Sequence, residues 1–352
     1  MSKGPRLDFT SDNISGASAP ILEALARANE GTAPAYGTDS HTAELERRLA
    51  QIFERPVAAL PVATGTAANA LALASIARAF EGIYCHGEAH VMTDECGAPE
   101  FYTGGAKLLG LASPDGRLLP DQLAAAVRHA RSMGVHHVQP AAVSVSQATE
   151  WGTVYSLEAL GALAQQAHAL GLKVHMDGAR FANALARLGC TPAQASWRAG
   201  IDILSLGATK NGALAAEVIV AFDPAAGAEL ASRRKRAGHL WSKMRFLSAQ
   251  LEAYLSDGLW LANARQANDM ARRLAAGLSA LAGVRLVQPV EANEIFAVLP
   301  KAMIARLREK GYGFYDWPAP QGESEDCVRV VASFDMRDSD VDAFIAAAGS
   351  GG

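Results

Sequence analysis

The sequence predicts an α/β protein: a large domain with a mostly parallel sheet, followed by a smaller α+β domain. Across residues 39–236, short apolar runs alternate with segments of helical period, which is typical of βαβ units. Beyond Arg236 the pattern changes to long helices with three short strands. No linker rich in Gly, Ser or Pro separates the two parts, so we expect them to pack firmly. We place an N-terminal arm and the large domain in residues 1–258, and the small domain in 259–352.

The composition agrees with a globular protein that acts on small molecules. Half of the 352 residues are hydrophobic and 19% are charged, which is enough apolar material for a large core. The net charge of −4 gives no basic field for nucleic acid or an anionic membrane. No run approaches the roughly 18 uncharged apolar residues of a membrane helix, and the first residues have no apolar signal region. We therefore expect a cytoplasmic protein whose partners are small molecules and copies of itself.

The four cysteines, Cys85, Cys96, Cys190 and Cys327, lie far apart and form no CxxC pair. We therefore expect reduced thiols in the core, with neither a disulfide framework nor a structural zinc site.

The predicted large domain starts with a helix that Asp39 or Ser40 can cap. Arg55-Pro56 ends this helix, because the residue before proline disfavours the helical conformation. A strand at 57–62 and a helix at 67–80 follow. Further strands are expected at 83–85, 107–111, 138–145, 173–177, 201–206 and 217–222, with helices between most of them.

The predicted small domain and the segment leading to it are mainly helical. We expect helices at 238–257, 259–281 and 339–348, and strands at 284–287, 294–299 and 327–333.

The first motif that points to chemistry is Thr64-Gly65-Thr66, between a predicted strand and a predicted helix. The amino end of a helix offers unpaired N–H groups, Gly65 permits close approach, and the threonine hydroxyls add donors. The turn therefore suits a phosphate group. An ordinary strand-to-helix turn with a threonine cap explains this segment equally well when it is taken alone.

The second motif is Asp177, at the end of a predicted strand and thus at the sheet edge where α/β proteins bind ligands. A carboxylate buried there needs a cationic or protonated partner, and a protonated pyridine nitrogen would serve. A salt bridge to Arg180 or a helix cap is the alternative.

The third motif is Lys210, which lies among small residues after the strand at 201–206. A confined lysine can attack a carbonyl in its neutral form, although a solvated loop lysine is the simpler alternative. Asp177 and Lys210 are 33 residues apart, about one βα unit and the next strand, which places both at one edge of the sheet.

A phosphate turn, a pyridinium carboxylate and a Schiff-base lysine, in this order, are the parts needed to bind pyridoxal 5'-phosphate in an aspartate-aminotransferase-like fold. The motifs for competing cofactors are missing, since the chain has no GxGxxG after a strand, no GxxxxGK and no HExxH.

The sequence also resembles the low-specificity L-threonine aldolases, including their phenylserine aldolase branch, over nearly the whole chain. The resemblance rests on Ser11-Asp-Asn-Ile, Tyr36-Gly-Thr-Asp39, Thr64-Gly-Thr-Ala-Ala-Asn69, Ala89-His90, Asp94-Glu-Cys-Gly-Ala-Pro-Glu100, His175-Met-Asp-Gly-Ala-Arg180, the Lys210 segment, Lys243-Met-Arg245 and Val328-Arg-Val-Val331. It implies a type I pyridoxal phosphate fold and a homo-oligomer, either a dimer or a dimer of dimers. It also implies retro-aldol cleavage of L-β-hydroxy-α-amino acids of the threonine, allo-threonine or phenylserine type to glycine and an aldehyde, via an external aldimine and a glycine quinonoid.

The resemblance also implies roles for individual residues. Lys210 looks like the aldimine lysine and Asp177 like the partner of the pyridine nitrogen, while Thr64, Gly65 and Thr66 resemble the phosphate turn. His90 matches a residue that stacks on the cofactor ring near the substrate hydroxyl. Ser11, Arg180 and Arg329 match the residues that hold the substrate carboxylate, and Arg180 also lies near the cofactor's phenolic oxygen in the family. Arg245 matches a residue that reaches the cofactor phosphate of the neighbouring subunit.

One segment departs from the resemblance. Many members of the family carry a histidine against the substrate hydroxyl where this chain has Thr149 or Glu150. The catalytic base is therefore open between His90, Glu150 and a water held by such groups. His86 and His90 have the spacing of a helical metal pair but no obvious third ligand, so no metal is expected.

The shared cofactor parts leave other reactions open. The alternative to an aldolase is another fold type I enzyme, either an aminotransferase or a β-eliminating lyase. A pyridoxal-fold regulatory protein without turnover is a further alternative, but no appended basic DNA-binding segment supports it.

Overall fold

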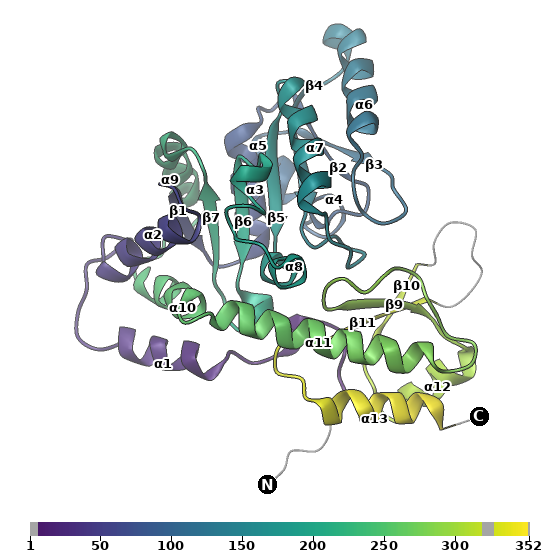
Figure 1. Ribbon diagram of the computed structural model, residues 1–352. Helices are drawn as coiled ribbons and strands as arrows, with labels where there is room; N and C mark the ends of the chain where they lie inside the picture. The colour runs from purple at the N-terminus through teal and green to yellow at the C-terminus, as the bar shows by residue number, and fades with distance from the viewer. Residues whose placement is uncertain (1–5, 319–326, 351–352) are drawn as a thin grey trace.

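The computed structural model describes residues 6–318 and 327–350, and its centre is one seven-stranded sheet in the order β1-β7-β6-β5-β4-β2-β3 (Figure 1). Neighbouring strands from β6 to β3 run parallel, whereas β7 is antiparallel to both β6 and β1. The predicted mostly parallel sheet is therefore confirmed. Its strands are β1 (Ala58–Val62), β2 (Glu81–His86), β3 (Lys107–Leu111), β4 (Gln139–Ser146), β5 (Lys173–Gly178), β6 (Ile203–Gly207) and β7 (Glu217–Ala221).

The central strands are apolar because helices cover both faces of the sheet. Every residue of β6 and of β7 is buried, as expected for strands without a solvent-facing side. The helices of this part are α1 (Ala19–Ala28), α2 (Ser40–Ile52), α3 (Gly65–Ile76), α4 (His90–Thr93), α5 (Ala98–Thr103), α6 (Pro120–Ser132), α7 (Leu157–Ala169), α8 (Phe181–Leu188), α9 (Gly227–Arg236) and α10 (Arg245–Leu255).

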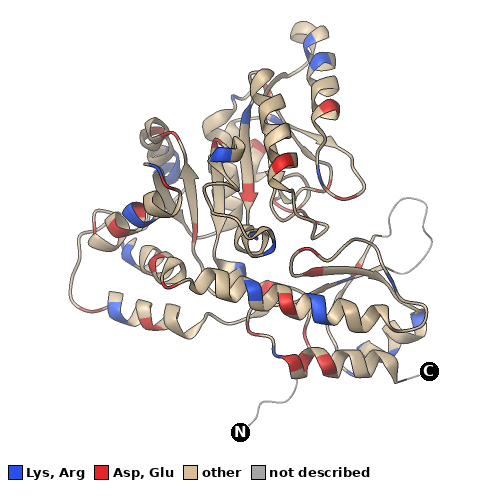
Figure 2. Cartoon of the chain, in the orientation of Figure 1, with Lys and Arg blue, Asp and Glu red and all other residues tan. Residues whose placement is uncertain are grey.

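The second part contains a four-stranded antiparallel sheet in the order β10-β11-β9-β8. Its elements are β8 (Arg285–Leu286), β9 (Glu294–Val298), β10 (Tyr315–Trp317), β11 (Cys327–Val331) and the helices α11 (Leu259–Ser279), α12 (Lys301–Glu309) and α13 (Asp338–Gly349). Charges of both signs are interspersed along α11, whereas the charged residues of α13 are all acidic (Figure 2).

Two segments tie the parts together. Helix α11 begins in the core of the large sheet, where Trp260 and Ala264 pack, and continues into the core of the small sheet (Figure 1). The N-terminal segment crosses to the small sheet, where the rings of Phe9 and Phe344 have centroids 4.8 Å apart. The division at residue 259 stays a prediction, and residues 1–5 of the predicted arm lie outside the described range.

Several expected elements differ from the structure. The helix expected at 238–257 is wrong in its first turns: the chain leaves α9, turns at Gly238 with φ +76°, and re-enters a helix only at Arg245. Strand β10 was not predicted, because a three-residue strand gives too short an alternation to detect. The small sheet therefore has four strands rather than three.

All four cysteines are unpaired in the structure, and Cys85 and Cys327 are buried as expected. The expectation that all four lie in the core is wrong, because Cys96 is exposed and Cys190 is only partly buried. Within the described residues, none of the helices has the length and hydrophobicity required to cross a lipid bilayer.

Candidate active site

A cavity of about 890 Å³ opens at the carboxyl ends of the parallel strands, beside the small domain. It brings together residues from the N-terminal segment, from the carboxyl ends of β1, β2, β4, β5 and β6, and from the small sheet. All predicted site residues except Arg245 line it: Ser11, Thr64, Gly65, Thr66, His90, Glu150, Asp177, Arg180, Lys210 and Arg329. Arg245 begins α10 and stacks over the Phe246 ring at 5.1 Å, outside this cavity.

The predicted phosphate turn forms the first turn of α3. Thr64 is the N-cap residue, and its hydroxyl oxygen accepts a hydrogen bond from the Ala67 N–H at 3.2 Å. Nothing lies within 4 Å of the position that a Cβ on Gly65 would occupy. Gly65 and Thr66 line the cavity, so the start of α3 leaves room for an anion, which the first N–H groups of a helix can bind.

Asp177 lies buried at the end of β5, and no cationic side chain from the described part of the chain forms an ion pair with it. Its carboxylate accepts from the Asn69 side-chain amide at 2.8 Å and from the Ala179 N–H at 3.0 Å, both neutral donors. Arg180, the alternative partner considered from the sequence, pairs with Asp12 instead. A buried carboxylate with only neutral donors is well suited to a protonated ring nitrogen.

Lys210 lies in a 3-10 turn (Thr209–Asn211) that follows β6 directly. The turn is held against α10 and α11, because the Asn211 side-chain amide donates to the Tyr254 hydroxyl at 2.9 Å and to the Trp260 carbonyl at 2.8 Å. Lys210 and Asp177 therefore reach the same cavity from neighbouring strands, as their spacing predicted.

His90 begins α4 and is held at two points. Its backbone N–H donates to Glu150 at 2.9 Å, and its ring Nδ1 lies 2.9 Å from a Glu95 oxygen. The hydrogen bond with Glu95 raises the pKa of His90 against the opposing effect of burial. His86 ends β2 and bonds Ser113, so His86 and His90 do not form a pair on one helix.

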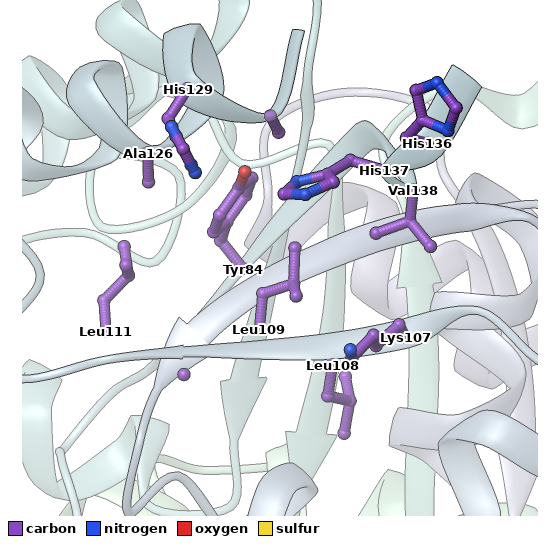
Figure 3. A pocket seen from close by; sticks show the side chains of 12 residues that line it. Tyr84, Lys107, Leu108, Leu109, Leu111, Ala126, His129, His136, His137 and Val138 are labelled. Carbon is purple, nitrogen blue, oxygen red and sulfur yellow. The ribbon is translucent and has the colours of Figure 1, made fainter. Parts of the chain in front are cut away.

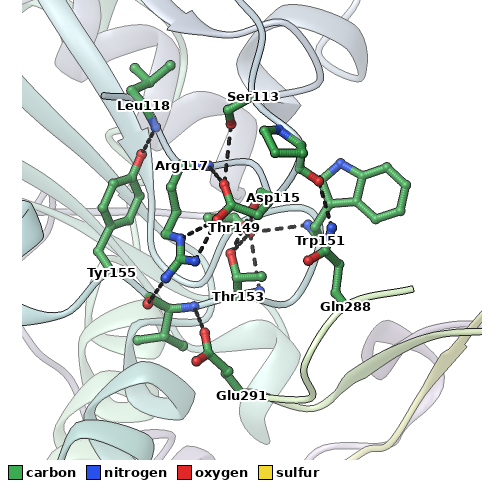
Figure 4. Close-up of polar contacts among 12 residues, drawn as sticks. Ser113, Asp115, Arg117, Leu118, Thr149, Trp151, Thr153, Tyr155, Gln288 and Glu291 are labelled. Carbon is green, nitrogen blue, oxygen red and sulfur yellow. Dashed lines mark hydrogen bonds and ion pairs between the residues drawn. The ribbon is translucent and has the colours of Figure 1, made fainter. Parts of the chain in front are cut away.

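The structure separates the two residues that replace the family's histidine. The Thr149 hydroxyl is buried away from the cavity, where it bonds the Thr153 hydroxyl at 2.8 Å and the Asp115 carbonyl at 3.3 Å (Figure 4). The neighbouring Val154 N–H donates to Glu291 of the small domain at 2.7 Å, so this loop is also a domain contact.

Glu150, in contrast, lines the cavity. One of its oxygens accepts from the Ser146 hydroxyl at 2.6 Å and from the His90 N–H, while the other is buried without a protein partner among the described residues. Burial raises the pKa of Glu150 to about 7. This carboxylate can therefore exchange a proton near neutral pH.

A buried group of charges lies where the N-terminal segment meets both domains. Arg180 donates to both Asp12 oxygens, at 2.8 and 3.1 Å, and its remaining terminal nitrogen lies 3.1 Å from Glu294. Burial by itself would raise the pKa of Asp12, but Arg180 and Lys210 hold it below its ordinary value.

Arg329 is held mainly by aromatic rings. Its guanidinium lies 4.8 Å from the Trp317 ring centroid and 5.4 Å from that of Tyr315, and it donates to the Thr10 carbonyl at 3.2 Å. Among the residues that the structure describes, the nearest carboxylate is that of Glu294, which is 4.0 Å from Arg329 and closer to Arg180. Arg329 therefore keeps charge available for an anion in the cavity.

Several residues of the site were not found from the sequence. Asn69, Glu95 and Asp12 stand inside the motifs quoted for the resemblance, so their position next to assigned residues was the available signal. Glu294 and Glu217 gave no such signal. Glu217 lines the cavity and accepts from the Ala208 N–H at 3.0 Å, and burial raises its pKa to about 7.

His90, Glu95 and Asp177 bring potential metal ligands within 4.8 Å of one another. The amide of Asn69 lies between the two carboxylates and donates to both, at 2.8 Å each. Donor hydrogens at that position would oppose a cation. The trio therefore forms a hydrogen-bonded chain rather than a metal centre.

A second hollow, of about 590 Å³, lies at the β3 edge of the sheet (Figure 3). Tyr84, His129 and His137 line it, but none of the predicted site residues does.

The large cavity fits pyridoxal 5'-phosphate. It combines an open helix start for the phosphate, a buried carboxylate for the ring nitrogen, a lysine for the aldehyde, and the His90 ring at its wall.

Comparison with known proteins agrees with this fit. The family model described as "Beta-eliminating lyase" matches residues 8–302. The chain is 41% identical to the low specificity L-threonine aldolase of Pseudomonas sp. (strain NCIMB 10558), over 95% of this chain and 94% of that protein. It is 44% identical to the enzyme of the same name from Pseudomonas aeruginosa, over 87% and 88% of the two chains.

Among solved structures, the threonine aldolase of Leishmania major superposes with a TM-score of 0.90 at 29% identity, covering 97% of this chain and 98% of that one. The fold is therefore that of type I pyridoxal phosphate enzymes, and the predicted cofactor and fold class are confirmed. The chain belongs to the beta-eliminating lyase family, in the group of low-specificity L-threonine aldolases, and is a lyase that uses pyridoxal 5'-phosphate.

Proposed function

We propose that this protein cleaves L-β-hydroxy-α-amino acids of the threonine, allo-threonine or phenylserine type to glycine and an aldehyde. The observation that carries the proposal is the single cavity in which Lys210 and Asp177 face a cationic clamp, Arg329, from the small domain. The names of the two Pseudomonas relatives support the same reaction.

Pyridoxal phosphate, when bound, supplies an electron sink next to the Cα of the amino acid. Lys210 would hold it through Nζ, and Asp177 would keep its ring nitrogen protonated. The phosphate would lie on the N–H groups at Gly65 and Thr66, with the Thr64 hydroxyl as a further donor. His90 would lie against the ring, and Arg180 near the phenolic oxygen.

The substrate carboxylate would bind Arg329, with Ser11 and Arg180 beside it. Arg329 is favoured as the main partner because two of its neighbours are aromatic rings, whereas Arg180 already faces Asp12 and Glu294. By holding the carboxylate, Arg329 would fix the orientation of the substrate and thus which bond at Cα is broken. That orientation would favour cleavage over racemisation.

The β-hydroxyl proton needs an acceptor, for which His90 and Glu150 are the candidates. We propose a mixed role for His90, which both lies against the ring and orients the hydroxyl or its water. Glu150 holds the His90 backbone and has a free oxygen and a pKa of about 7, so it is the second candidate. The Thr149 hydroxyl is buried away from the cavity, so Thr149 is not a candidate for the base.

The assay that tests the function is incubation of the purified yellow holoenzyme with a panel of L-β-hydroxy-α-amino acids. We expect equal amounts of glycine and aldehyde without an added amino acceptor. A keto acid with conversion of the cofactor to its amine form would indicate an aminotransferase, ammonia release a β-eliminating lyase, and no turnover a binding protein.

We also propose a cytoplasmic homo-oligomer, a dimer or a dimer of dimers, in which Arg245 reaches the cofactor phosphate of the neighbouring subunit. Sedimentation of the holoenzyme tests the oligomeric state. Arg245→Ala should then lower the affinity for the cofactor.

A further inference from the structure

We propose that Glu95 is a positioning residue that keeps the proton of the neutral His90 ring on Nδ1, and that Asn69 links this pair to Asp177. The inference rests on the proposed function in one respect, because that function gives His90 its contact with cofactor and substrate. The arrangement itself is independent of the reaction.

The geometry consists of three consecutive hydrogen bonds. The same Glu95 oxygen lies 2.9 Å from Nδ1 of His90 and 2.8 Å from the Asn69 amide nitrogen, and that nitrogen lies 2.8 Å from Asp177. The two hydrogens of one amide thus serve two carboxylates. The chain runs from His90 at the wall of the cavity to Asp177, the carboxylate that would pair with the ring nitrogen of the cofactor.

Burial makes this arrangement specific. The Glu95 side chain has no exposed surface, whereas 39% of the His90 side chain is exposed. A carboxylate in such a place requires donors, and the described residues supply only the His90 ring and the Asn69 amide. Burial and Asp177 raise the pKa of Glu95, whereas the hydrogen bonds from His90 and Asn69 favour its ionised form. When Glu95 is ionised it can only accept, so the neutral His90 ring carries its proton on Nδ1 and leaves Nε2 as the proton acceptor.

The charges around His90 act in known directions. Glu95 and Asp177 raise the pKa of His90, whereas burial and Lys210 without cofactor lower it, and Glu150 contacts only the His90 backbone. The hydrogen bond with Glu95 is the largest of these effects, and the net shift is upward. Glu95 should therefore make Nε2 more basic as well as orient it.

The test uses the holoenzyme labelled with ¹⁵N in its histidine rings. The chain has nine histidines, and the His90 signals are assigned by their loss in His90→Phe. In the neutral ring we expect Nδ1 protonated and Nε2 unprotonated. Glu95→Gln should lower the pKa of His90 by about one unit, the shift typical for loss of a nearby opposite charge. The acid limb of kcat/KM should move to lower pH by the same amount.

Two further variants separate positioning from a general structural effect. Glu95→Asp retains the charge and should keep the pKa of His90 nearer to that of the wild type than Glu95→Gln does. Glu100 lies five residues after Glu95 in the sequence, and its carboxylate is not among the main groups that affect the pKa of His90. Glu100→Gln should therefore leave the His90 titration unchanged.

An unchanged His90 pKa in folded Glu95→Gln would overturn the proposal, as would an Nε2–H tautomer in the wild type. The wild-type spectrum decides the matter even if the variant does not fold. Failure of the aldolase assay with these NMR results intact would overturn the proposed function instead, because the NMR readout does not depend on turnover.

Discussion

Replacement of Arg329 by alanine should weaken the use of substrate far more than the binding of cofactor. The Arg329 side chain is 17% exposed, and its guanidinium packs on the rings of Trp317 and Tyr315. Removal of this side chain therefore creates a gap at the cavity wall rather than in the core. Its carboxylate neighbour Glu294 keeps Arg180 at 3.1 Å and is not left without a counter-charge. The fold and the cofactor site should therefore survive.

The expected magnitude follows from the loss of one charged hydrogen-bonding partner. Such a loss costs on the order of 2 to 4 kcal/mol in transition-state stabilisation. At 1.36 kcal/mol for each factor of ten, kcat/KM should fall roughly 30- to 900-fold. Most of this change should appear in KM if the carboxylate contact is equally strong in the ground and transition states.

The assay compares wild type, Arg329→Ala and Arg329→Lys in kcat/KM and in cofactor content from the visible absorbance. Lysine retains the charge but not the planar fork, so Arg329→Lys should lie between the other two. An alanine variant with unchanged kcat/KM and normal cofactor content would refute the assignment of Arg329 to the substrate carboxylate.

Four other outcomes test the rest of the site. Borohydride reduction and peptide mapping should place the cofactor on Lys210, and a label on any other lysine would show that the assignment is wrong. Asp12→Asn should lower the thermal midpoint of unfolding, because it removes one of the two carboxylates that face the buried Arg180, at a cost of about 1 to 3 kcal/mol while Glu294 remains; an unchanged midpoint would contradict this. His90→Phe should bind cofactor nearly normally and lose about 10² to 10⁴ in turnover, and Glu150→Gln should lose less; the reverse order would make Glu150 the base. Burial raises the pKa of Glu150 from 4.5 to about 7, so the unfolded chain ionises first and the wild-type protein loses stability as the pH rises from 4.5 to 7. Glu150→Gln lacks this loss and should become more stable relative to wild type between pH 5 and 8, as measured by calorimetry.

Local sequence patterns determined most of the large domain. The strands around Asp177 and Lys210 were predicted to within two residues, because buried parallel strands are short apolar runs with clear ends. The shared edge of the sheet followed from chain topology, since the carboxyl ends of neighbouring parallel strands lie together. The cofactor followed from these two residues and the turn at Gly65.

The sequence patterns did not predict two features of the structure, a very short strand and a break between two helices. Strand β10 is held by its pairing with β11, and three residues carry no usable period. The break before α10 depends on the left-handed backbone at Gly238, which a glycine permits but does not demand.

Tertiary structure alone decided how the charges are paired. Asp12, Arg180 and Glu294 are 282 residues apart from first to last, and nothing in the sequence indicates that they share one buried cluster. The same holds for Glu95 and Asn69, whose side chains meet between His90 and Asp177. The sequence by itself determined which groups reach the sheet edge, because strand direction and period are local properties. Which carboxylate neutralises which cation depends on distances of a few ångströms between distant segments, and only the packed chain sets those distances.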